Sequence, residues 1–431
     1  MQIDSGQKPP FNDQQSSPER TWSKASLYAL FMLMLINAIN QVDRNLFGLM
    51  MPLIKADIAI SDTMLGVVSG LAFALFYGLA GVPIGYLADR WSRRNIISIG
   101  LILWSAATIT TGMARNVVQL VLSRFFLGVG EASGTAPATS MIADFFKKEQ
   151  RPLAMSCFAM AGSVGMLIGF PILGWVSEQY GWQRTFIVSG IFGIVLALIF
   201  LVTVAEPQRG KHEATPGEKL NFKATARMLA NSPAYLLLVL TSVLLSIMLS
   251  ASMAWTPSYL VAAHGMTTAE VGIAIGFFRG PSGIAGALIG GALTTVMARN
   301  DARWLYRVPA IMLLLACPSQ LFLLYAEKGW MVNAGLALEN FFTVGQIGPV
   351  FALVITVTTA NTRAVAIALL LLAMNIIGQS CGPIIVGVIS DLIAQADKAE
   401  ALRTGLTVTA CSAFLAGIVC FIAGRKMAEE W

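Results

Sequence analysis

The chain has 431 residues, of which 56% are hydrophobic and 12% are charged, and its mean hydropathy is +0.70. Soluble proteins carry roughly 25% charged residues, and no water-soluble fold could bury this much apolar surface. The composition therefore excludes a soluble protein and predicts one that crosses a membrane many times.

The first apolar segment, at 25–52, carries two ionisable residues, Asp43 and Arg44. It is longer than a signal-peptide core and no small-residue cleavage site follows it, so we expect a retained helix. The preceding residues 1–24 are polar and rich in Pro, Gln and Ser, which predicts a disordered cytoplasmic N-terminus. An ionised group at bilayer depth is costly and usually marks a transport pathway or a coupling site.

Apolar runs of about 20 residues recur along the rest of the chain, and each is long enough to span a bilayer. We predict an all-α membrane protein with twelve transmembrane helices at 25–52, 63–87, 95–114, 117–141, 152–177, 183–205, 234–260, 268–296, 305–325, 331–359, 363–390 and 404–424.

The longest polar stretch lies in the middle of the chain and has six predicted helices on either side. It predicts two six-helix bundles, at 25–205 and 234–424, joined by a cytoplasmic linker at 206–233 and followed by a cytoplasmic tail at 425–431. Most of the 29 Lys and Arg residues then fall on one side, which places both termini in the cytoplasm and the protein in the cytoplasmic (inner) membrane. The net charge of +6 follows from this topology and requires no nucleic-acid partner.

The fourth predicted helix holds Arg124 and Glu131, which are seven residues apart and so lie roughly 10 Å apart on one face. Helices 1 and 4 run in opposite directions, and counting from their outer ends puts Asp43 and Arg124 at similar depth. We therefore expect an Asp43–Arg124 ion pair, with Glu131 deeper toward the cytoplasm. Protonation of Asp43 would weaken this attraction and couple transport to protons. A permanent bridge that only fixes packing, or arginines that hold an anion, are the alternatives.

Arg279 in helix 8 and Glu339 in helix 10 are the only mid-helix ionisable groups of the second half. Their depths allow them to face the same cavity as Asp43. A role in helix packing is equally consistent with the sequence.

Other functional classes lack their motifs. The five cysteines show no C-x-x-C spacing and are odd in number, which indicates neither disulfides nor a metal site. The sequence contains no G-x-x-x-x-G-K-[ST], H-E-x-x-H or G-x-S-x-G, and neither histidine lies in a predicted helix. We expect no enzyme activity and no cofactor, while a channel or a substrate-sensing receptor stays an alternative to a carrier.

The segment Gly85-Tyr-Leu-Ala-Asp89-Arg90-Trp-Ser-Arg93-Arg94 follows the second helix. It resembles the signature loop of the major facilitator superfamily, whose architecture is twelve helices in two bundles. The resemblance implies a latch that closes the cytoplasmic side and faces the segment at Arg363. A basic loop that only sets topology is the alternative.

Further motifs resemble the spinster-like transporters of that superfamily, and less closely the organic anion:cation symporters. They are Val42-Asp43-Arg44-Asn45, Arg124-Phe-Phe-Leu-Gly-Val-Gly-Glu131-Ala-Ser, and Ile142-Ala-Asp144-Phe-Phe followed by Arg151. We assign Asp144 and Arg151 to the latch as well.

The resemblance implies a secondary active transporter that works by alternating access and is coupled to protons. Its expected cargo is an amphipathic lipid-like molecule of the lysophospholipid or sphingolipid type, or alternatively a small organic anion such as a sugar acid. Asp43 would carry the proton, Glu131 would be the second acid, and Arg44 and Arg124 would be ion-pair partners or anion holders. We expect a monomer in contact with membrane lipids.

Overall fold

The computed structural model describes residues 22–88, 90–147, 150–208, 222–359, 362–393 and 397–429, and every regular element within them is a helix. The first half of the chain forms α1 (Lys24–Asp57), α2 (Asp62–Ser69), α3 (Leu71–Ala88), α4 (Arg93–Gly112), α5 (Val117–Glu131), α6 (Thr135–Phe145) and α7 (Arg151–Thr203). The second half forms α8 (Phe222–Ala230), α9 (Pro233–His264), α10 (Thr268–Ala274), the π-helix η1 (Ile275–Arg279), α11 (Gly280–Ala298), α12 (Trp304–Leu324), α13 (Gly329–Gly345), α14 (Ile347–Thr356), α15 (Arg363–Ala373), the π-helix η2 (Met374–Gln379), α16 (Ser380–Ile393) and α17 (Lys398–Glu429).

Ten segments of the described chain are long and apolar enough to cross a membrane. Two differences separate this number from the twelve predicted helices. α7 runs through 53 residues but reverses at Gly181, whose φ of 82° is accessible to glycine without strain, so it contains the two helices predicted at 152–177 and 183–205. The helix predicted at 117–141 is interrupted between Glu131 and Thr135, which leaves α5 and α6 each too short to span a bilayer alone.

The break between α5 and α6 is stabilised by side-chain bonding and close packing. The Gly130 carbonyl accepts from both the hydroxyl and the backbone amide of Ser133, at 2.7 and 3.1 Å, which closes a tight turn at the end of α5. α4 packs directly on this turn, since a Cβ built on Gly100 would lie 1.5 Å from the Ser133 Oγ. Glu131 therefore ends α5 at a fixed position within the protein.

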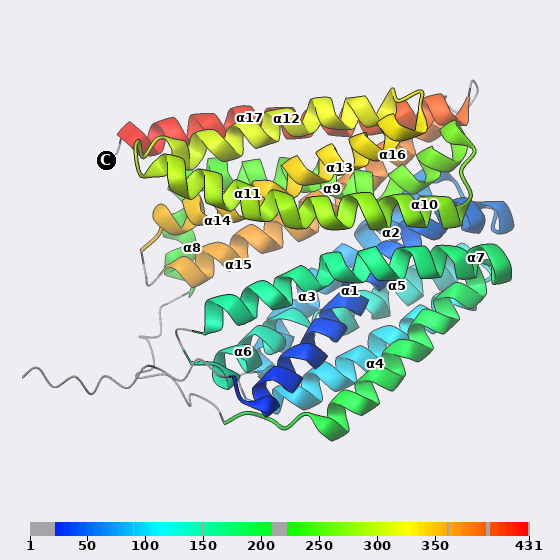
Figure 1. The fold of residues 1–431 in the computed structure, drawn as a ribbon, viewed down its shortest axis with the longest axis horizontal. Helices are drawn as coiled ribbons and strands as arrows, with labels where there is room; N and C mark the ends of the chain where they lie inside the picture. The colour runs from blue at the N-terminus through cyan, green and yellow to red at the C-terminus, as the bar shows by residue number, and fades with distance from the viewer. Residues whose placement is uncertain are drawn as a thin grey trace, which may run out of the picture.

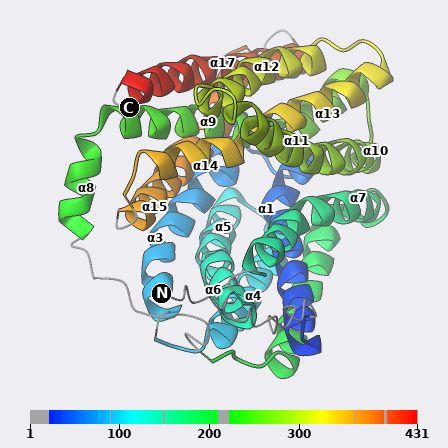
Figure 2. The same cartoon turned by 60° about the vertical axis from the view of Figure 1, so that its left-hand side comes forward.

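The helices form two groups, with α1 to α7 in one and α9 to α17 in the other (Figures 1 and 2). One buried apolar cluster belongs to the first group and two belong to the second. A further cluster joins both groups and contains Phe47 of α1, Phe170 of α7, Trp255 of α9 and Val271 of α10.

We call the end of the molecule that holds the turn between α1 and α2 the outer end, following the predicted orientation. The opposite end, where α1 begins and α17 ends, is the inner end (Figure 1). The cluster shared by both groups includes Ile58 and Ile60 of the α1–α2 turn, so the two halves are sealed together toward the outer end.

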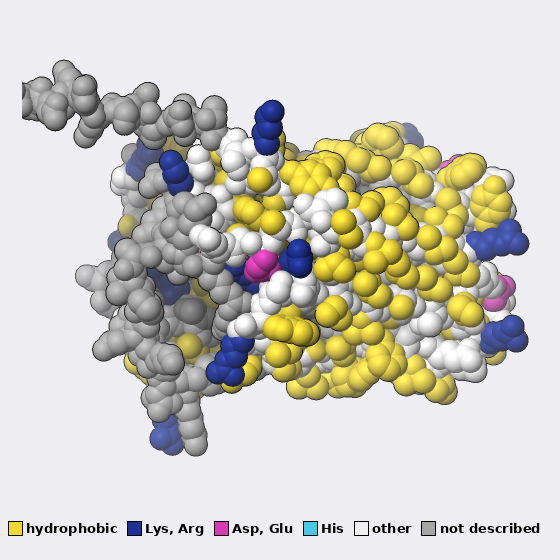
Figure 3. Space-filling view, turned by 90° about the horizontal axis from the view of Figure 1, so that it is seen from below, with side chains coloured by type: hydrophobic (Ala, Val, Ile, Leu, Met, Phe, Trp, Pro, Cys, Tyr) yellow, Lys and Arg dark blue, Asp and Glu magenta, His cyan; other side chains and the backbone are white. Residues whose placement is uncertain are grey.

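The surface matches a membrane environment. In the space-filling view hydrophobic side chains cover a broad area of the face, while Lys and Arg gather toward its two ends (Figure 3). Exposed large apolar side chains such as Phe192, Val202 and Leu392 contribute to the outside of the molecule. Such a surface is stable against lipid tails and unstable against water.

Candidate substrate and coupling site

Adjacent positions on α1 point Asp43 and Arg44 in different directions, because successive residues of a helix are about 100° apart. Asp43 is buried and accepts a hydrogen bond of 2.5 Å from the Ser189 hydroxyl in the second part of α7. Its other oxygen, Oδ2, has no hydrogen-bond partner among the described residues. Asp43 is therefore a buried acid held by a neutral hydroxyl.

Arg44 points instead toward α5 and binds Glu131. Its Nε and Nη2 donate to the same oxygen of Glu131 at 3.0 and 2.9 Å, and the Glu131 side chain is fully buried. The guanidinium also lies over the rings of Phe73 and Tyr77, 5.0 and 4.8 Å from their centres. Arg44 thus joins α1, α3 and α5.

Arg124 is 1% exposed and makes no hydrogen bond or ion pair with any residue that the structure describes. Its guanidinium lies over the ring of Phe47 at 4.4 Å. The predicted Asp43–Arg124 ion pair is therefore wrong: Glu131 pairs with Arg44, because the two neighbouring α1 side chains face different helices. Asp43 and Glu131 act on Arg124 only through their electrostatic fields, without a bond to its guanidinium.

A cavity of about 170 Å³ lies between the two groups of helices. Arg44 and Arg124 line it, whereas Asp43 and Glu131 are absent from its wall. The other lining residues are Gln41, Asn45, Gly48, Ser69 and Phe73 from the first half and Ser246, Leu249, Ser250, Met253, Ala254, Gln379 and Pro383 from the second. The wall combines two cationic groups, polar side chains and an apolar surface, and it contains no acid.

Arg279 and Glu339 form a second ion pair, with 3.0 Å between Nη2 and Oε2 and 1% exposure of each side chain. Arg279 ends the π-helix η1 and also donates to the Ser252 hydroxyl at 2.7 Å, while the Asn340 amide donates to its backbone carbonyl at 2.7 Å. Neither member of the pair lines the cavity. The pair therefore lies off this wall, as Asp43 does, and its contacts connect α9, η1 and α13.

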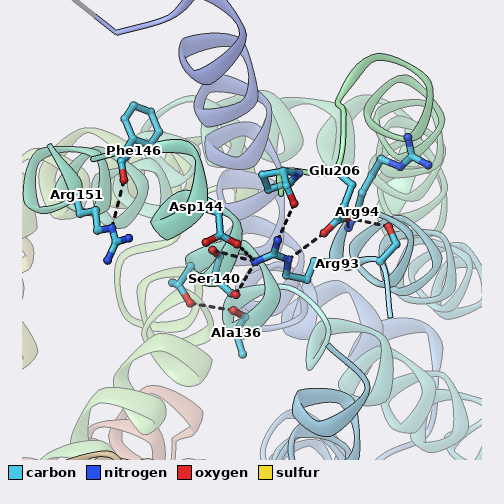
Figure 4. A network of polar contacts seen from close by, with 11 residues as sticks. Arg93, Arg94, Ala136, Ser140, Asp144, Phe146, Arg151 and Glu206 are labelled. Atoms are coloured by element: carbon cyan, nitrogen blue, oxygen red, sulfur yellow. Dashed lines mark hydrogen bonds and ion pairs between the residues drawn. The ribbon is translucent and has the colours of Figure 1, made fainter. Parts of the chain in front are cut away.

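The residues expected to form a latch are only partly brought together. Arg93 is 3% exposed and donates to Asp144 Oδ2 at 2.6 Å and to the Ser140 hydroxyl at 2.9 Å (Figure 4). On its other side its Nε donates to Glu206 Oε1 at 3.0 Å, and Nη2 donates to the Pro207 carbonyl at 3.2 Å. Arg93 therefore connects α4 and α6 to the segment that leaves α7.

Glu206 was missed in the sequence because it lies in the predicted linker, where an acid is unremarkable. Its carboxylate accepts from the Ser92 hydroxyl and the Arg94 backbone amide, both at 2.8 Å, at the N-terminus of α4. Partial burial acts to raise the pKa of Glu206, but the bonds from Arg94, Ser92 and Arg93 outweigh it and hold this pKa below its usual value. The sequence feature that could have drawn attention to Glu206 is its position directly after a predicted transmembrane helix.

The other latch residues lie apart from this network. Arg90 lies over the ring of Tyr86 at 3.7 Å, and Arg151 donates to the Phe146 carbonyl at 3.3 Å. Arg363 begins α15, and its Nε has no partner among the described residues. A Cβ on Gly85 would meet nothing within 4 Å. Asp89 falls outside the described residues.

The comparison with known proteins decides the family. The sequence model of the Major Facilitator Superfamily matches residues 33–370, which is more than half of the chain. The chain belongs to the major facilitator superfamily. It is accordingly a multi-pass membrane protein of a transporter family, as the sequence motifs indicated.

Curated relatives include spinster proteins and sugar-acid transporters. An MFS-type efflux pump of Mycolicibacterium smegmatis is 28% identical over 94% of this chain and 92% of its own length. The sphingosine-1-phosphate transporter SPNS2 of Xenopus tropicalis is 26% identical over 96% and 86% of the two chains. The probable galactarate/D-glucarate transporter GudP of Bacillus subtilis is 26% identical over 73% and 75%. The resemblance to spinster proteins is confirmed, and sugar-acid transporters match as well.

Among solved structures, a bacterial homologue of the human lysosomal transporter spinster has a TM-score of 0.82 in its inward-facing, unoccupied conformation. It is 24% identical in sequence, and the match covers 95% of this chain and 99% of that one. This likeness shows a shared fold. Within the described residues no cluster of His, Cys, Asp and Glu is arranged to hold a metal ion.

Proposed function

We propose that this protein is a secondary active transporter of the cytoplasmic membrane that carries an organic anion by alternating access. The observation that supports this most directly is Arg124, a buried guanidinium on the wall of the cavity between the two halves that has no bonded anion. A buried cation is expensive unless an anion accompanies it. A carboxylate or phosphate of the cargo would supply that anion with paired, charge-assisted hydrogen bonds.

The cargo is an amphipathic lipid-like anion of the lysophospholipid or sphingolipid type. Phe73, Leu249 and Met253 provide apolar wall on which a hydrocarbon chain can pack beside the guanidinium. The similarity to a sphingosine-1-phosphate transporter supports this choice.

A small sugar acid is the second candidate. Gln41, Asn45, Ser246, Ser250 and Gln379 offer hydrogen-bonding groups that a polyhydroxylated carboxylate would use and an acyl chain would not. The similarity to a galactarate/D-glucarate transporter supports it.

Proton coupling is assigned to Asp43, with Glu131 as the second acid. Asp43 has no ion-pair partner in the described structure, whereas Glu131 binds Arg44 through two nitrogens. An ionised carboxylate buried without a bonded cation is costly, so Asp43 is the acid best placed to take up and release a proton. Protonation of Glu131 would in turn weaken its ion pair with Arg44 and free the Arg44 guanidinium to interact with the cavity.

The remaining assignments follow from this mechanism. The two moving bodies are the bundles at 25–205 and 234–424, the chain crosses the membrane twelve times with both ends in the cytoplasm, and residues 206–233 link the bundles. Arg93, Asp144 and Glu206 hold the linker to the first bundle, and the protein works as a monomer surrounded by lipid.

Uptake and counterflow in proteoliposomes test the proposal. We expect saturable uptake of either a lysophospholipid-type cargo or galactarate, with preloaded unlabelled cargo accelerating entry of the labelled one. Arg124→Gln should raise the KM by about 10- to 100-fold, since it removes a charged hydrogen bond. The control is Arg115→Gln, which changes an exposed arginine beyond the cavity. Uptake without counterflow would indicate a channel, and equal KM values for the two variants would contradict the role of Arg124.

A further inference from the structure

The outer closure depends on one acid from the second half of the chain. Asp391, near the end of α16, accepts hydrogen bonds from the backbone amides of Asp62 at 3.0 Å and Thr63 at 2.8 Å, the first two residues of α2. The Ser61 hydroxyl accepts from the third amide, of Met64, at 3.1 Å. The free amides of a helix N-terminus need such acceptors. For α2, two of them come from the other half of the protein.

Side chains reinforce this contact. The Ser390 hydroxyl donates to Asp62 Oδ2 at 2.7 Å, and both residues are buried. Lys55, at the end of α1, forms an ion pair with the other oxygen of Asp62. Lys398 interacts electrostatically with both Asp62 and Asp391. The two lysines limit the repulsion between the acids, so the contact is attractive as a whole.

The backbones of α2 and α16 approach each other closely, and the two helices lie side by side in Figure 1. A Cβ on Gly387 would lie 2.3 Å from the Asp62 carbonyl oxygen and 2.9 Å from the Thr63 Cα. A Cβ on Gly66 would lie 2.4 Å from the Pro383 carbonyl oxygen. Contacts of this kind with backbone atoms cannot be relieved by a change of rotamer, so the closed arrangement requires glycine at both positions.

Toward the inner end the same line of contact opens. On α3, which continues from α2, a Cβ on Gly78 would still reach Ile376 of η2 at 3.3 Å. One and two turns further on, a Cβ on Gly81 or Gly85 would meet no atom within 4 Å. The halves are therefore joined along α2 and α16 at the outer end and separate toward the inner end.

We propose that Asp391 is a positioning residue of the transport cycle, which holds the protein closed at the outer end by capping α2 of the opposite half. Opening to the outside removes this carboxylate from the two amides, so the strength of the cap sets the population of outward-open protein. This inference rests on the proposed alternating access and is independent of the cargo and of proton coupling.

The test measures how often the cavity opens to the outside. Ser69 lines the cavity, one residue before the close contact at Gly70. Ser69→Cys is placed in a background without the five native cysteines, in sealed vesicles of known orientation. The rate of modification by a membrane-impermeant maleimide, added at the outer face, is proportional to the outward-open population even when that population is small.

Asp391→Asn should raise this rate about tenfold, because it removes the negative charge and one of the two oxygens that accept from the α2 amides. The matched control is Asp57→Asn. Asp57 also lies at the outer end and accepts bonds from Trp182 at 2.8 Å and Gln183 at 2.9 Å, but all three residues belong to the first half. The modification rate of Asp57→Asn should stay within about twofold of the parent rate, since the bonds of Asp57 do not cross between the halves.

Gly387→Ala provides a second variant that leaves every polar group in place. It should raise the rate as Asp391→Asn does, whereas Gly81→Ala, where a Cβ meets nothing, should not. Maleimide added at the inner face should modify none of the variants faster than the parent. Parent-like rates in both Asp391→Asn and Gly387→Ala, an equal rise in Asp57→Asn, or faster modification from both faces would overturn the proposal. Loss of transport alone would bear on the proposed function and not on this contact.

Discussion

Arg124 and Arg279 are both buried guanidiniums, but their surroundings assign them different tasks. Arg279 has a carboxylate at 3.0 Å and a serine hydroxyl at 2.7 Å, so its charge is balanced within the protein. Arg124 faces the cavity with only an aromatic ring against it. A charge that is balanced supports packing, and one that is left open to a cavity is available to a ligand.

A prediction at the residue scale concerns Arg279 and Glu339. Glu339→Leu should lower the free energy of unfolding by about 3 kcal/mol, because it leaves Arg279 buried without a counter-charge. The double variant Arg279→Met with Glu339→Leu should recover most of this loss, since both charges are removed together. Denaturant unfolding in detergent measures the two values. A double variant as unstable as the single one would show that the pair has another role.

The sequence determines which residues are candidates, but it does not determine their partners. Arg124, Glu131, Asp43 and Arg44 stand out because ionisable groups are rare in apolar segments. Helical spacing places Arg124 and Glu131 on one face, yet the Arg44–Glu131 pair depends on how α1 is rotated against α5, which tertiary packing decides. The hydroxyl beside Asp43 comes from α7, 146 residues away, and a serine in an apolar helix carries no signal of its own.

At the scale of the elements, two connections are made by acids at helix N-termini. Glu206 accepts from the Arg94 amide at the start of α4, and Asp391 accepts from two amides at the start of α2. Acids at helix N-termini are stabilised by the amides and by the helix dipole. The first contact fixes the linker to its own bundle, while the second joins the two bundles.

The Glu206 contact predicts a pH dependence of stability. Because the pKa of Glu206 is lower in the folded protein than its usual value, the ionised form stabilises the fold above that usual value, and this contribution is lost as the pH falls through the folded pKa. The melting temperature of the parent should therefore exceed that of Glu206→Gln at pH 7, and the difference should shrink by pH 4. Glu327→Gln, at an exposed acid, should show no such change. A difference that is constant with pH would contradict the assignment.

Helix positions were predicted well where an apolar run ends at a clear breaker, as at Gly181 and in the linker after Thr203. The break after Glu131 was not predicted, because Ala132, Ser133 and Gly134 contain no proline and continue a helical pattern. At this break α4 packs closely against Ser133 through Gly100, a tertiary contact that single-sequence periodicity does not report.

At the scale of the whole molecule, the contacts between the two halves belong to one conformation, in which the outer end is closed. Apolar packing and the Asp391 cap join the halves at the outer end, and each ion pair that the structure describes at the inner end stays within one half. Alternating access requires a second arrangement in which these outer contacts are broken.

Coupling of that exchange to protons is the central claim, and Asp43→Asn tests it most directly. Asparagine keeps the acceptor for Ser189 but cannot take up a proton. In proteoliposomes the variant should retain counterflow and lose accumulation driven by a pH gradient, while the control Asp57→Asn should retain both. Accumulation by Asp43→Asn at the parental level, with the same pH profile, would contradict the account.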